Sequence, residues 1–237
     1  MSTEPLTVCC WKWKSPPGYR SNFTASTVNV LRSMVDRHYR HPHNFVCITD
    51  DPEGIDGDIR IVPLWDDFKN LKGPNGVNCY PRLRAFSREA ADFIGPRFVS
   101  LDLDTVALND LAPLWQRSDD FVIWGDTARG TPYNGSMFLL RAGTRSQVWE
   151  TFDPIHSPLK AKALRYIGSD QAWIGACLGL REKKWTQTDG VFSFRNDLQA
   201  GRKPLPAWAR MVMFHGRYDP WMPDVQRQHP WVKEHYH

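Results

Sequence analysis

The sequence predicts an α/β fold in which a mixed, mostly parallel sheet is flanked by helices. Three observations carry this prediction. Short apolar segments alternate with segments of helical periodicity over the first 103 residues. The last of these apolar segments leads into two aspartates, and open α/β sheets bind ligands at the carboxyl ends of their strands. The length of 237 residues suits one such domain.

The expected elements follow the order of strands connected by helices. Strands are predicted at residues 6–11, 44–49, 60–64, 98–103, 121–124 and 136–140, and helices at residues 25–38 and 83–93. In the first helix, Val28, Leu31, Val35 and Tyr39 recur at helical spacing. This face of the helix is therefore expected to pack on the sheet.

Two segments lack regular periodicity. Residues 69–81 contain Gly73, Pro74, Gly76 and Pro81, which indicates a loop long enough to act as a lid or to contact substrate. Beyond about residue 201 the sequence is rich in Pro, Trp and His. We therefore expect a single domain over residues 1–237 that ends in an irregular tail packed over the core.

The composition narrows the class of ligand. A net charge of +4 and a pI of about 8.8 suit anionic ligands such as nucleotide diphosphates, without the dense basic stripe of a dedicated nucleic-acid binder. The five cysteines show no metal-type spacing, which favours reduced thiols. No basic and apolar leader begins the sequence, and no apolar run is long enough to cross a bilayer. We expect a cytoplasmic protein without a membrane span.

The strongest chemical signal is the pair Asp102 and Asp104, at the end of the apolar segment that starts at Phe98. If the strand continues through both, alternation places the two carboxylates on one side, roughly 6–7 Å apart. Carboxylate oxygens are the ligands that Mn²⁺ and Mg²⁺ prefer, and such an ion can also bind a diphosphate. The motif alone is unspecific, but its position after an apolar strand favours a metal-binding role.

Several blocks of sequence resemble the GT-A glycosyltransferases, and in particular the retaining group that contains glycogenin and bacterial lipooligosaccharide galactosyltransferases. Residues 101–111 resemble the metal-binding segment of this group. Four further blocks occur in the family's order, at residues 82–86, 133–137, 169–171 and 214–221. Residues 46–51 also resemble a strand of related uncharacterised bacterial glycosyltransferases. Together these blocks extend over nearly the whole chain.

The resemblance implies a role for individual residues. His215 would be the third metal ligand beside Asp102 and Asp104, and its neighbour Gly216 would approach the donor. Asp170 would lie beside the donor sugar, with Asn134 and Gln171 as hydrogen-bonding neighbours. The alternative for Asp170 is a helix cap. Arg82 would contact the diphosphate, whereas Arg84 and Arg88 are interpreted as solvated charges.

The nucleotide base has candidate contacts near the first strand. Trp11 and Tyr19 are candidates for stacking on the base, with Asp50 at its edge, although core packing explains Trp11 equally well. The sequence departs from the family at Asp219, where a lysine is usual. Arg217, two positions earlier, is the candidate replacement for that positive charge.

These observations predict a metal-dependent glycosyltransferase that moves a hexose from a nucleotide diphosphate sugar, with UDP expected, to a hydroxyl acceptor with retention. The expected cofactor is Mn²⁺ or Mg²⁺, and the expected acceptor is a glycan or a lipid-linked glycan. A DNA glycosyltransferase acting on a hydroxylated base is an alternative, because the tail from residue 201 mixes aromatic and basic residues. A nucleotidyltransferase is a second alternative, although the glycine-rich loop expected after the first strand is poor.

Overall fold

The computed structural model describes residues 5–14, 23–73, 78–125 and 130–237, which form two compact units. The first unit contains residues 1–63, 101–117 and 185–237, and the second contains residues 64–100 and 118–184. The chain thus enters each unit more than once. Among the described residues, no helix is long and apolar enough to cross a membrane.

A seven-stranded, mostly parallel sheet runs through the described residues, and the first unit supplies three of its strands. These are β1 (Leu6–Lys12), β2 (His43–Thr49) and β3 (Arg60–Pro63), in the order β3-β2-β1. Both pairings are parallel, with Cys10 opposite Cys47 and Ile48 opposite Val62. All seven residues of β1 are buried, as expected for a parallel strand covered on both faces.

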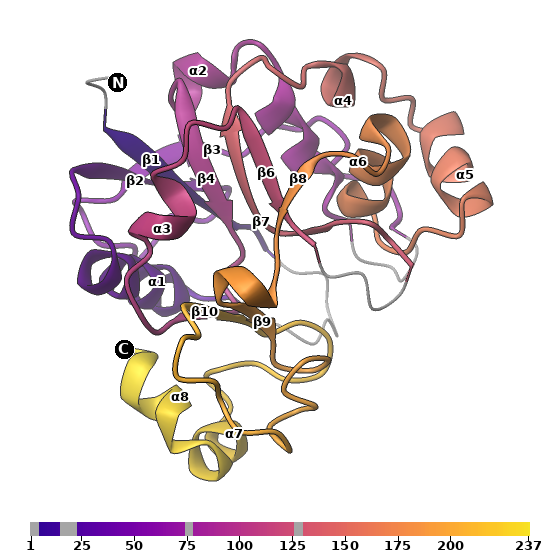
Figure 1. Cartoon of the computed structure of the whole chain (residues 1–237). Coiled ribbons are helices and arrows are strands. Elements are labelled where there is room, and N and C mark those ends of the chain that lie inside the picture. The colour runs from indigo at the N-terminus through magenta and orange to yellow at the C-terminus, as the bar shows by residue number, and fades with distance from the viewer. Residues whose placement is uncertain (1–4, 15–22, 74–77, 126–129) are drawn as a thin grey trace. The chain divides into compact units, whose positions relative to one another are not determined.

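The helix predicted at residues 25–38 is confirmed as α1 (Ala25–His38). Its buried residues are Thr27, Val28, Leu31, Met34 and Val35, and Tyr39 directly after the helix is 3% exposed. The predicted apolar face is therefore the packed face. Figure 1 labels α1, β1 and β2, all of which belong to the first unit.

A second, three-stranded sheet also belongs to the first unit. Its strands are β5 (Thr105–Ala107), β10 (Met211–Met213) and β9 (Val191–Ser193), in the order β5-β10-β9. The remaining elements of this unit are α3 (Ala112–Trp115), η2 (Gln187–Asp189), α7 (Pro223–Gln228) and α8 (Pro230–His235). The helices α7 and α8 pack on each other at the C-terminal end of the chain (Figure 1). The tail beyond residue 201 is therefore less irregular than the sequence predicts.

The second unit contains the other four strands of the large sheet, in the order β4-β7-β6-β8. They are β4 (Arg97–Leu101), β7 (Asn134–Arg141), β6 (Phe121–Trp124) and β8 (Lys183–Trp185), of which the first and last extend by one residue into the other unit. The helices are η1 (Tyr80–Phe86), α2 (Ala90–Phe93), α4 (Gln147–Glu150), α5 (His156–Ala163) and α6 (Asp170–Leu178). Phe86, Phe121 and Phe138 form the aromatic centre of this unit, with ring centroids 5.1–6.4 Å apart.

Two predicted elements differ from the structure. The helix expected at residues 83–93 is divided into the 3₁₀-helix η1 and the single turn α2, because Ser87 adopts an extended conformation between them. The strand expected to reach residue 103 ends at Leu101, and residues 103 and 104 form a bend. Strand alternation therefore does not place Asp102 and Asp104 on one side, and the separation predicted from it does not apply.

Candidate active site

A buried ion pair between an arginine and an aspartate lies in the second unit. Arg82 belongs to η1, and Asp170 is the first residue of α6. Arg82 Nε lies 3.0 Å from Asp170 Oδ2, and the two side chains are only 6% and 3% exposed. Arg82 Nη1 also donates a hydrogen bond to the carbonyl oxygen of Gly135 at 3.4 Å. Because a buried charge requires a partner, the two side chains hold each other in place.

Gly135 allows strand β7 to approach this ion pair. A Cβ atom at position 135 would lie 2.9 Å from Asp170 Oδ2 and 3.4 Å from Arg82 Nη2. Any other residue here would displace the Asp170 carboxylate. The N–H of Gly135 also donates to Gln171 Oε1 at 3.4 Å. Gln171 is itself positioned by donation from its Nε2 to the carbonyl oxygen of Ile167 at 2.9 Å.

Asn134 completes the group of predicted catalytic residues. It is the first residue of β7 and is 8% exposed, and its Oδ1 accepts the N–H of Ser136 at 2.9 Å. The structure thus assembles Asn134, Asp170 and Gln171 around the chain near Gly135.

The start of α6 resolves the alternative interpretation of Asp170. Ser169 is the N-cap residue, yet its side chain makes no capping hydrogen bond, and its Oγ accepts the N–H of Cys79 at 3.0 Å. Asp170 lies in the first helical turn and is 2% exposed, so it is not a solvated cap. Burial, together with the negative charge of Asp170, raises the pKa of Tyr80 to about 12. Tyr80 therefore remains a neutral neighbour of the carboxylate.

The three arginines around η1 differ in their surroundings. Arg84 is half-exposed, pairs with Asp67 at 2.9 Å and lies over the ring of Trp65. Arg88 is exposed and pairs with Glu150 at 2.8 Å. Arg82 alone is buried, with the contacts to Asp170 and Gly135 described above. The structure therefore supports a role for Arg82 in positioning Asp170, and its predicted contact with the diphosphate stays a prediction.

The first unit brings Asp104 and His215 together from distant parts of the chain. The antiparallel pairing of β5 and β10 places Thr105 opposite Met213. The ladder extends by one hydrogen bond, from the N–H of Phe214 to the carbonyl oxygen of Asp104 at 2.8 Å. Asp104, just before β5, and His215, two residues after β10, therefore lie at the same end of the small sheet.

Ser193, a residue that sequence reasoning missed, orients the histidine. Ser193 Oγ lies 2.7 Å from His215 Nε2, and Ser193 is the last residue of β9, which pairs with β10. A metal-bound histidine usually contacts an oxygen partner through its other ring nitrogen. Only the pairing of β9 with β10 reveals this contact, since 22 residues separate the two side chains in the sequence.

The predicted metal ligands fit a divalent ion in their chemistry. Two carboxylates and an imidazole are acceptable ligands for Mn²⁺, and Asp104 and His215 share one end of a sheet. Within the described part of the chain, however, no three His, Cys, Asp or Glu side chains converge closely enough to hold an ion. The set Asp102, Asp104 and His215 is therefore a prediction that the donor types support.

The C-terminal helix places a tyrosine beside these carboxylates. The hydroxyl of Tyr236 is buried and has no hydrogen-bond partner within the described ranges. Burial first, and then the charges of Asp104 and Asp219, raise the pKa of Tyr236 well above its ordinary value. Asp219 is completely buried. Asp219, where the sequence resemblance leads us to expect a lysine, is thus an interior carboxylate and not a surface charge.

The backbone conformation and the space at the position after His215 both require a glycine. Gly216 has a φ of +89°, and a Cβ atom there would lie 2.8 Å from Arg195 Nη1. Arg195, which sequence reasoning also missed, is exposed. Arg217, the predicted replacement for the lysine, is exposed too, and its guanidinium lies over the ring of Tyr218 at 5.2 Å. Two exposed cations therefore lie close to His215.

The predicted base-binding residues differ in their burial and in their contacts. Trp11 lies on the fully buried strand β1 and is 4% exposed, as core packing requires. Asp50 follows β2 and accepts the N–H of Lys14 at 3.1 Å. Lys12, which the sequence did not single out, is 2% exposed and pairs with Asp51 at 2.7 Å. Tyr19 lies outside the described residues.

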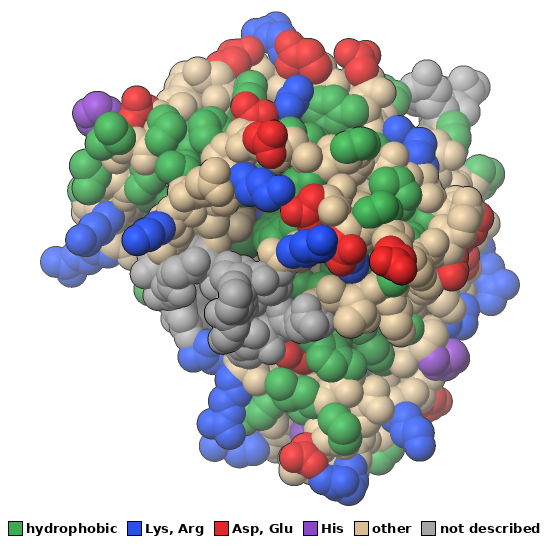
Figure 2. Space-filling model, turned by 180° about the vertical axis from the view of Figure 1, so that it is seen from behind, with side chains coloured by type: hydrophobic (Ala, Val, Ile, Leu, Met, Phe, Trp, Pro, Cys, Tyr) green, Lys and Arg blue, Asp and Glu red, His purple; other side chains and the backbone are tan. Residues whose placement is uncertain are grey.

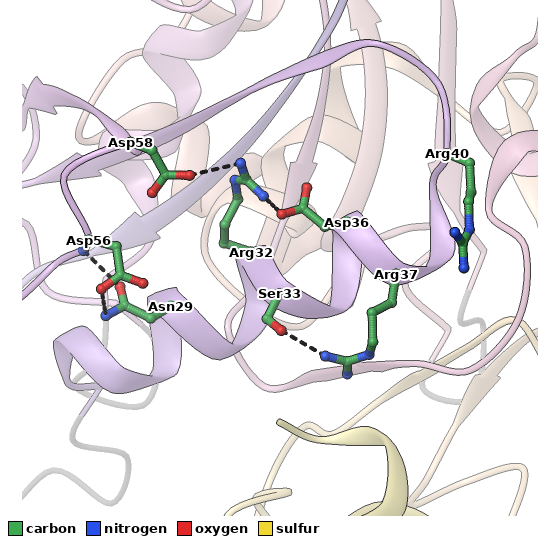
Figure 3. Close-up of a pocket in the computed structure, with 8 residues that line it drawn as sticks. All are labelled: Asn29, Arg32, Ser33, Asp36, Arg37, Arg40, Asp56 and Asp58. Atoms are coloured by element: carbon green, nitrogen blue, oxygen red, sulfur yellow. Dashed lines mark hydrogen bonds and ion pairs between the residues drawn. The ribbon is translucent and has the colours of Figure 1, made fainter.

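A charged hollow of about 370 Å³ lies on the outer side of α1 (Figure 3). It is lined by Asn29, Arg32, Ser33, Asp36, Arg37, Arg40, Asp56 and Asp58. Arg32 pairs with both Asp36 and Asp58, and Arg37 donates to Ser33 Oγ at 2.7 Å. Because these charges largely neutralise each other, the hollow shows no preference for an anionic ligand. None of the predicted site residues lines it.

This fold is that of the GT-A glycosyltransferases. Among solved structures, the galactosyltransferase LgtC with donor and acceptor sugar analogues has a TM-score of 0.61 at 15% identity, covering 98% of this chain and 97% of that chain. GlyE of Streptococcus pneumoniae TIGR4 has a TM-score of 0.60 at 13% identity, covering 97% of this chain and 61% of that chain. Mouse xyloside xylosyltransferase 1 has a TM-score of 0.53 at 12% identity, covering 90% of this chain and 98% of that chain.

Sequence comparison adds nothing to this structural likeness. No protein-family profile and no curated protein sequence matches the chain. At identities of 11–15%, the solved structures establish the fold and leave the activity to be argued from the site.

Proposed function

We propose that this chain is a metal-dependent glycosyltransferase that moves a hexose from a nucleotide diphosphate sugar, with UDP as the expected nucleotide, to a hydroxyl acceptor with retention of configuration. The observation that carries the proposal is the buried pair of Arg82 and Asp170, packed against Gly135 and Gln171, within a GT-A fold. In the reaction, the bond between the anomeric carbon and the diphosphate oxygen breaks. A bond from that carbon to the acceptor oxygen forms, and the acceptor hydroxyl gives up its proton to the released diphosphate.

In this proposal Asp170 acts next to the sugar. A carboxylate held in a fixed position can orient a sugar hydroxyl and stabilise positive charge that develops at the anomeric carbon. Arg82 holds this carboxylate in place, and Gly135 leaves the space that it needs. One solved LgtC structure carries a substitution of an active-site glutamine. We propose a comparable role for Gln171, whose Oε1 accepts the N–H of Gly135.

The residues of the first unit would bind the diphosphate end of the donor. Asp102, Asp104 and His215 are the proposed ligands of Mn²⁺ or Mg²⁺, an ion that would neutralise the charge on the leaving diphosphate. Arg195 and Arg217 are the candidate cations for phosphate oxygens, because both are exposed near His215 and Gly216. Asp50 remains the candidate for the base.

The proposed acceptor is a glycan or a lipid-linked glycan. The aromatic residues of the tail, which suggested DNA, pack against other rings within their own unit: Trp231 lies 6.1 Å from Phe214, and Trp221 lies 6.3 Å from Tyr236. Only Trp208 among the large aromatic side chains is strongly exposed in the described ranges. Anchoring of the tail explains these residues, and no observation favours DNA.

A thermal-shift screen of nucleotide sugars in the presence of Mn²⁺ tests donor binding. A ligand at 100 times its Kd stabilises the folded state by about 2.7 kcal/mol through mass action. We expect a UDP-sugar to raise the midpoint with Mn²⁺ present and to lose this effect in EDTA. A panel in which no nucleotide sugar shifts the midpoint at millimolar concentration would contradict the proposal.

A further inference from the structure

The segment from Ile155 to Ile167, here called the α5 segment, packs in an unusual way. Helix α5 turns two small residues, Ser157 and Ala161, inward. The large aliphatic side chains face solvent instead: Ile155 is 69% exposed, Leu159 59%, Leu164 47% and Ile167 40%. An ordinary surface helix buries its large apolar residues. Four exposed aliphatic side chains within 13 residues therefore indicate a surface that contacts something apolar.

The charged residues within the α5 segment have one sign. Residues 154–169 contain Lys160, Lys162 and Arg165 and no Asp or Glu. Lys162 and Arg165 are exposed, and Lys160 Nζ lies 5.6 Å from the ring of Trp173. Asp153, just before the segment, accepts the N–H groups of Ile155 and His156 and so serves the start of the helix. The segment is thus apolar and cationic.

The end of α5 holds a cation where a glycine is usual. The N–H of Tyr166 donates to the carbonyl oxygen of Ala161 at 3.0 Å, and the N–H of Arg165 donates to that of Lys162 at 2.9 Å. This is a Schellman arrangement, whose left-handed residue is normally glycine. That residue here is Arg165, with a φ of +60°. The chain therefore accepts backbone strain at a position that carries an exposed positive charge.

We propose that the α5 segment docks on the surface of an anionic lipid bilayer. Of the four aliphatic residues, Leu159 belongs to α5 and the others flank the helix. Exposed aliphatic side chains can enter the apolar layer of a membrane while neighbouring lysine and arginine side chains bind its anionic headgroups. Protein interfaces instead favour aromatic residues and are depleted in lysine, so a protein partner fits this segment less well. Figure 2 is turned by 180° from the view of Figure 1, so the helix that Figure 1 labels α5 lies at its left edge. Hydrophobic and basic side chains lie side by side at that edge.

The docking does not depend on the proposed glycosyl transfer. It would hold the protein where a lipid-linked acceptor lies, but the surface is defined by exposure and charge alone. Each cation near an anionic membrane contributes roughly a fivefold gain in binding. Binding should therefore need both parts of the segment, the aliphatic side chains and the cations.

Co-sedimentation of the full chain with vesicles tests this inference without any turnover. We expect binding to phosphatidylcholine vesicles that contain 30% phosphatidylglycerol and at least tenfold weaker binding to pure phosphatidylcholine. Leu159→Glu should reduce binding to the anionic vesicles at least tenfold. Trp208→Glu is the matched control, because Trp208 is 62% exposed and belongs to the other unit. That variant should bind like the parent protein.

A second variant separates the effect of the positive charge on vesicle binding from its effect on the stability of the fold. Arg165→Gly removes a cation and relieves the left-handed strain, so it should bind anionic vesicles several-fold more weakly while unfolding at the same or a higher temperature. The inference is overturned if the parent protein binds neither type of vesicle at low salt, or if Leu159→Glu and Trp208→Glu bind equally well. Equal binding to neutral and anionic vesicles would overturn it as well.

Discussion

At the scale of single residues, the candidate site depends on a buried charge pair whose loss would destabilise the fold. Arg82 and Asp170 are both nearly inaccessible, so removing one side chain leaves an uncompensated buried charge in the other. Such a loss typically costs about 3–5 kcal/mol, whereas replacing both charges by apolar groups can be close to neutral. The pair therefore couples stability to the geometry of the carboxylate.

A double-mutant cycle measures this coupling. We expect Arg82→Met and Asp170→Leu each to lower the free energy of unfolding by about 3 kcal/mol or more. The double variant should lose clearly less than the sum of the two, because no buried charge is left unpaired. Urea unfolding curves of the four proteins supply the comparison. Additive losses would mean that the two residues do not depend on each other.

Gly135 provides a milder way to move the carboxylate. In Gly135→Ala the new Cβ atom would press on Asp170 Oδ2, and a displacement of about 1 Å at a catalytic group can cost on the order of a hundredfold in rate. We expect kcat to fall by that order and KM for the donor to change little. Gly57→Ala is the control, because a Cβ atom there meets nothing within 4 Å. Equal kcat values for both variants would remove Asp170 from the catalytic step.

At this scale the sequence singled out individual residues but not the contacts between them. Asp170, Gln171 and Asn134 were singled out because the short motifs that contain them resemble those of the GT-A group. Ser193 and Arg195 were not, because each touches the His215 region only after β9 pairs with β10. No local pattern marks such a contact.

At the scale of elements, α8 is held to α1 by contacts that involve several titratable groups. Arg37 of α1 donates to the carbonyl oxygens of His235 and His237, and the rings of His38 and His235 lie 6.0 Å apart. Burial, with the charges of Arg37, His235 and Arg40, lowers the pKa of His38 to about 4. Burial also lowers the pKa of His235. The contact therefore requires neutral histidines.

This arrangement predicts a loss of stability in mild acid. As pH falls below about 6.5, the unfolded chain binds a proton at His38 and the folded chain does not, so stability decreases until about pH 4. Thermal midpoints measured from pH 7 to pH 4 should fall, and His38→Gln should flatten part of this slope. An unchanged slope in His38→Gln would mean that other groups cause the acid sensitivity.

The accuracy of the element predictions follows from the strength of each periodic signal. Helix α1 was placed to the residue because its apolar face repeats over four turns. The prediction of a single helix at residues 83–93 was wrong. The apolar spacing continues through Ser87, but the helical backbone conformation is interrupted there. The short strands β5, β9 and β10 were missed, because three residues carry too little periodicity to predict.

At the scale of the whole molecule, the fold was predicted from the order of several weak motifs. Each unit contains segments from distant parts of the sequence, so motifs far apart, such as the residues around Asp104 and His215, meet in one unit. The structural likeness to LgtC at 15% identity confirms the fold. The acceptor cannot be predicted from the sequence, because acceptor binding depends on the shape of the protein surface and not on a motif.

Release of nucleoside diphosphate from a panel of nucleotide sugars, measured with Mn²⁺ and with excess EDTA, tests the central claim most directly. We predict that a UDP-hexose is cleaved or transferred with Mn²⁺ and not with EDTA. The variant Asp104→Asn should lose at least a hundredfold in rate, about 3 kcal/mol of transition-state stabilisation, without unfolding. Activity that persists in EDTA, or a near-normal rate for Asp104→Asn, would contradict the metal-dependent mechanism. If no nucleotide sugar releases its nucleoside diphosphate, the proposed glycosyltransferase activity itself is contradicted.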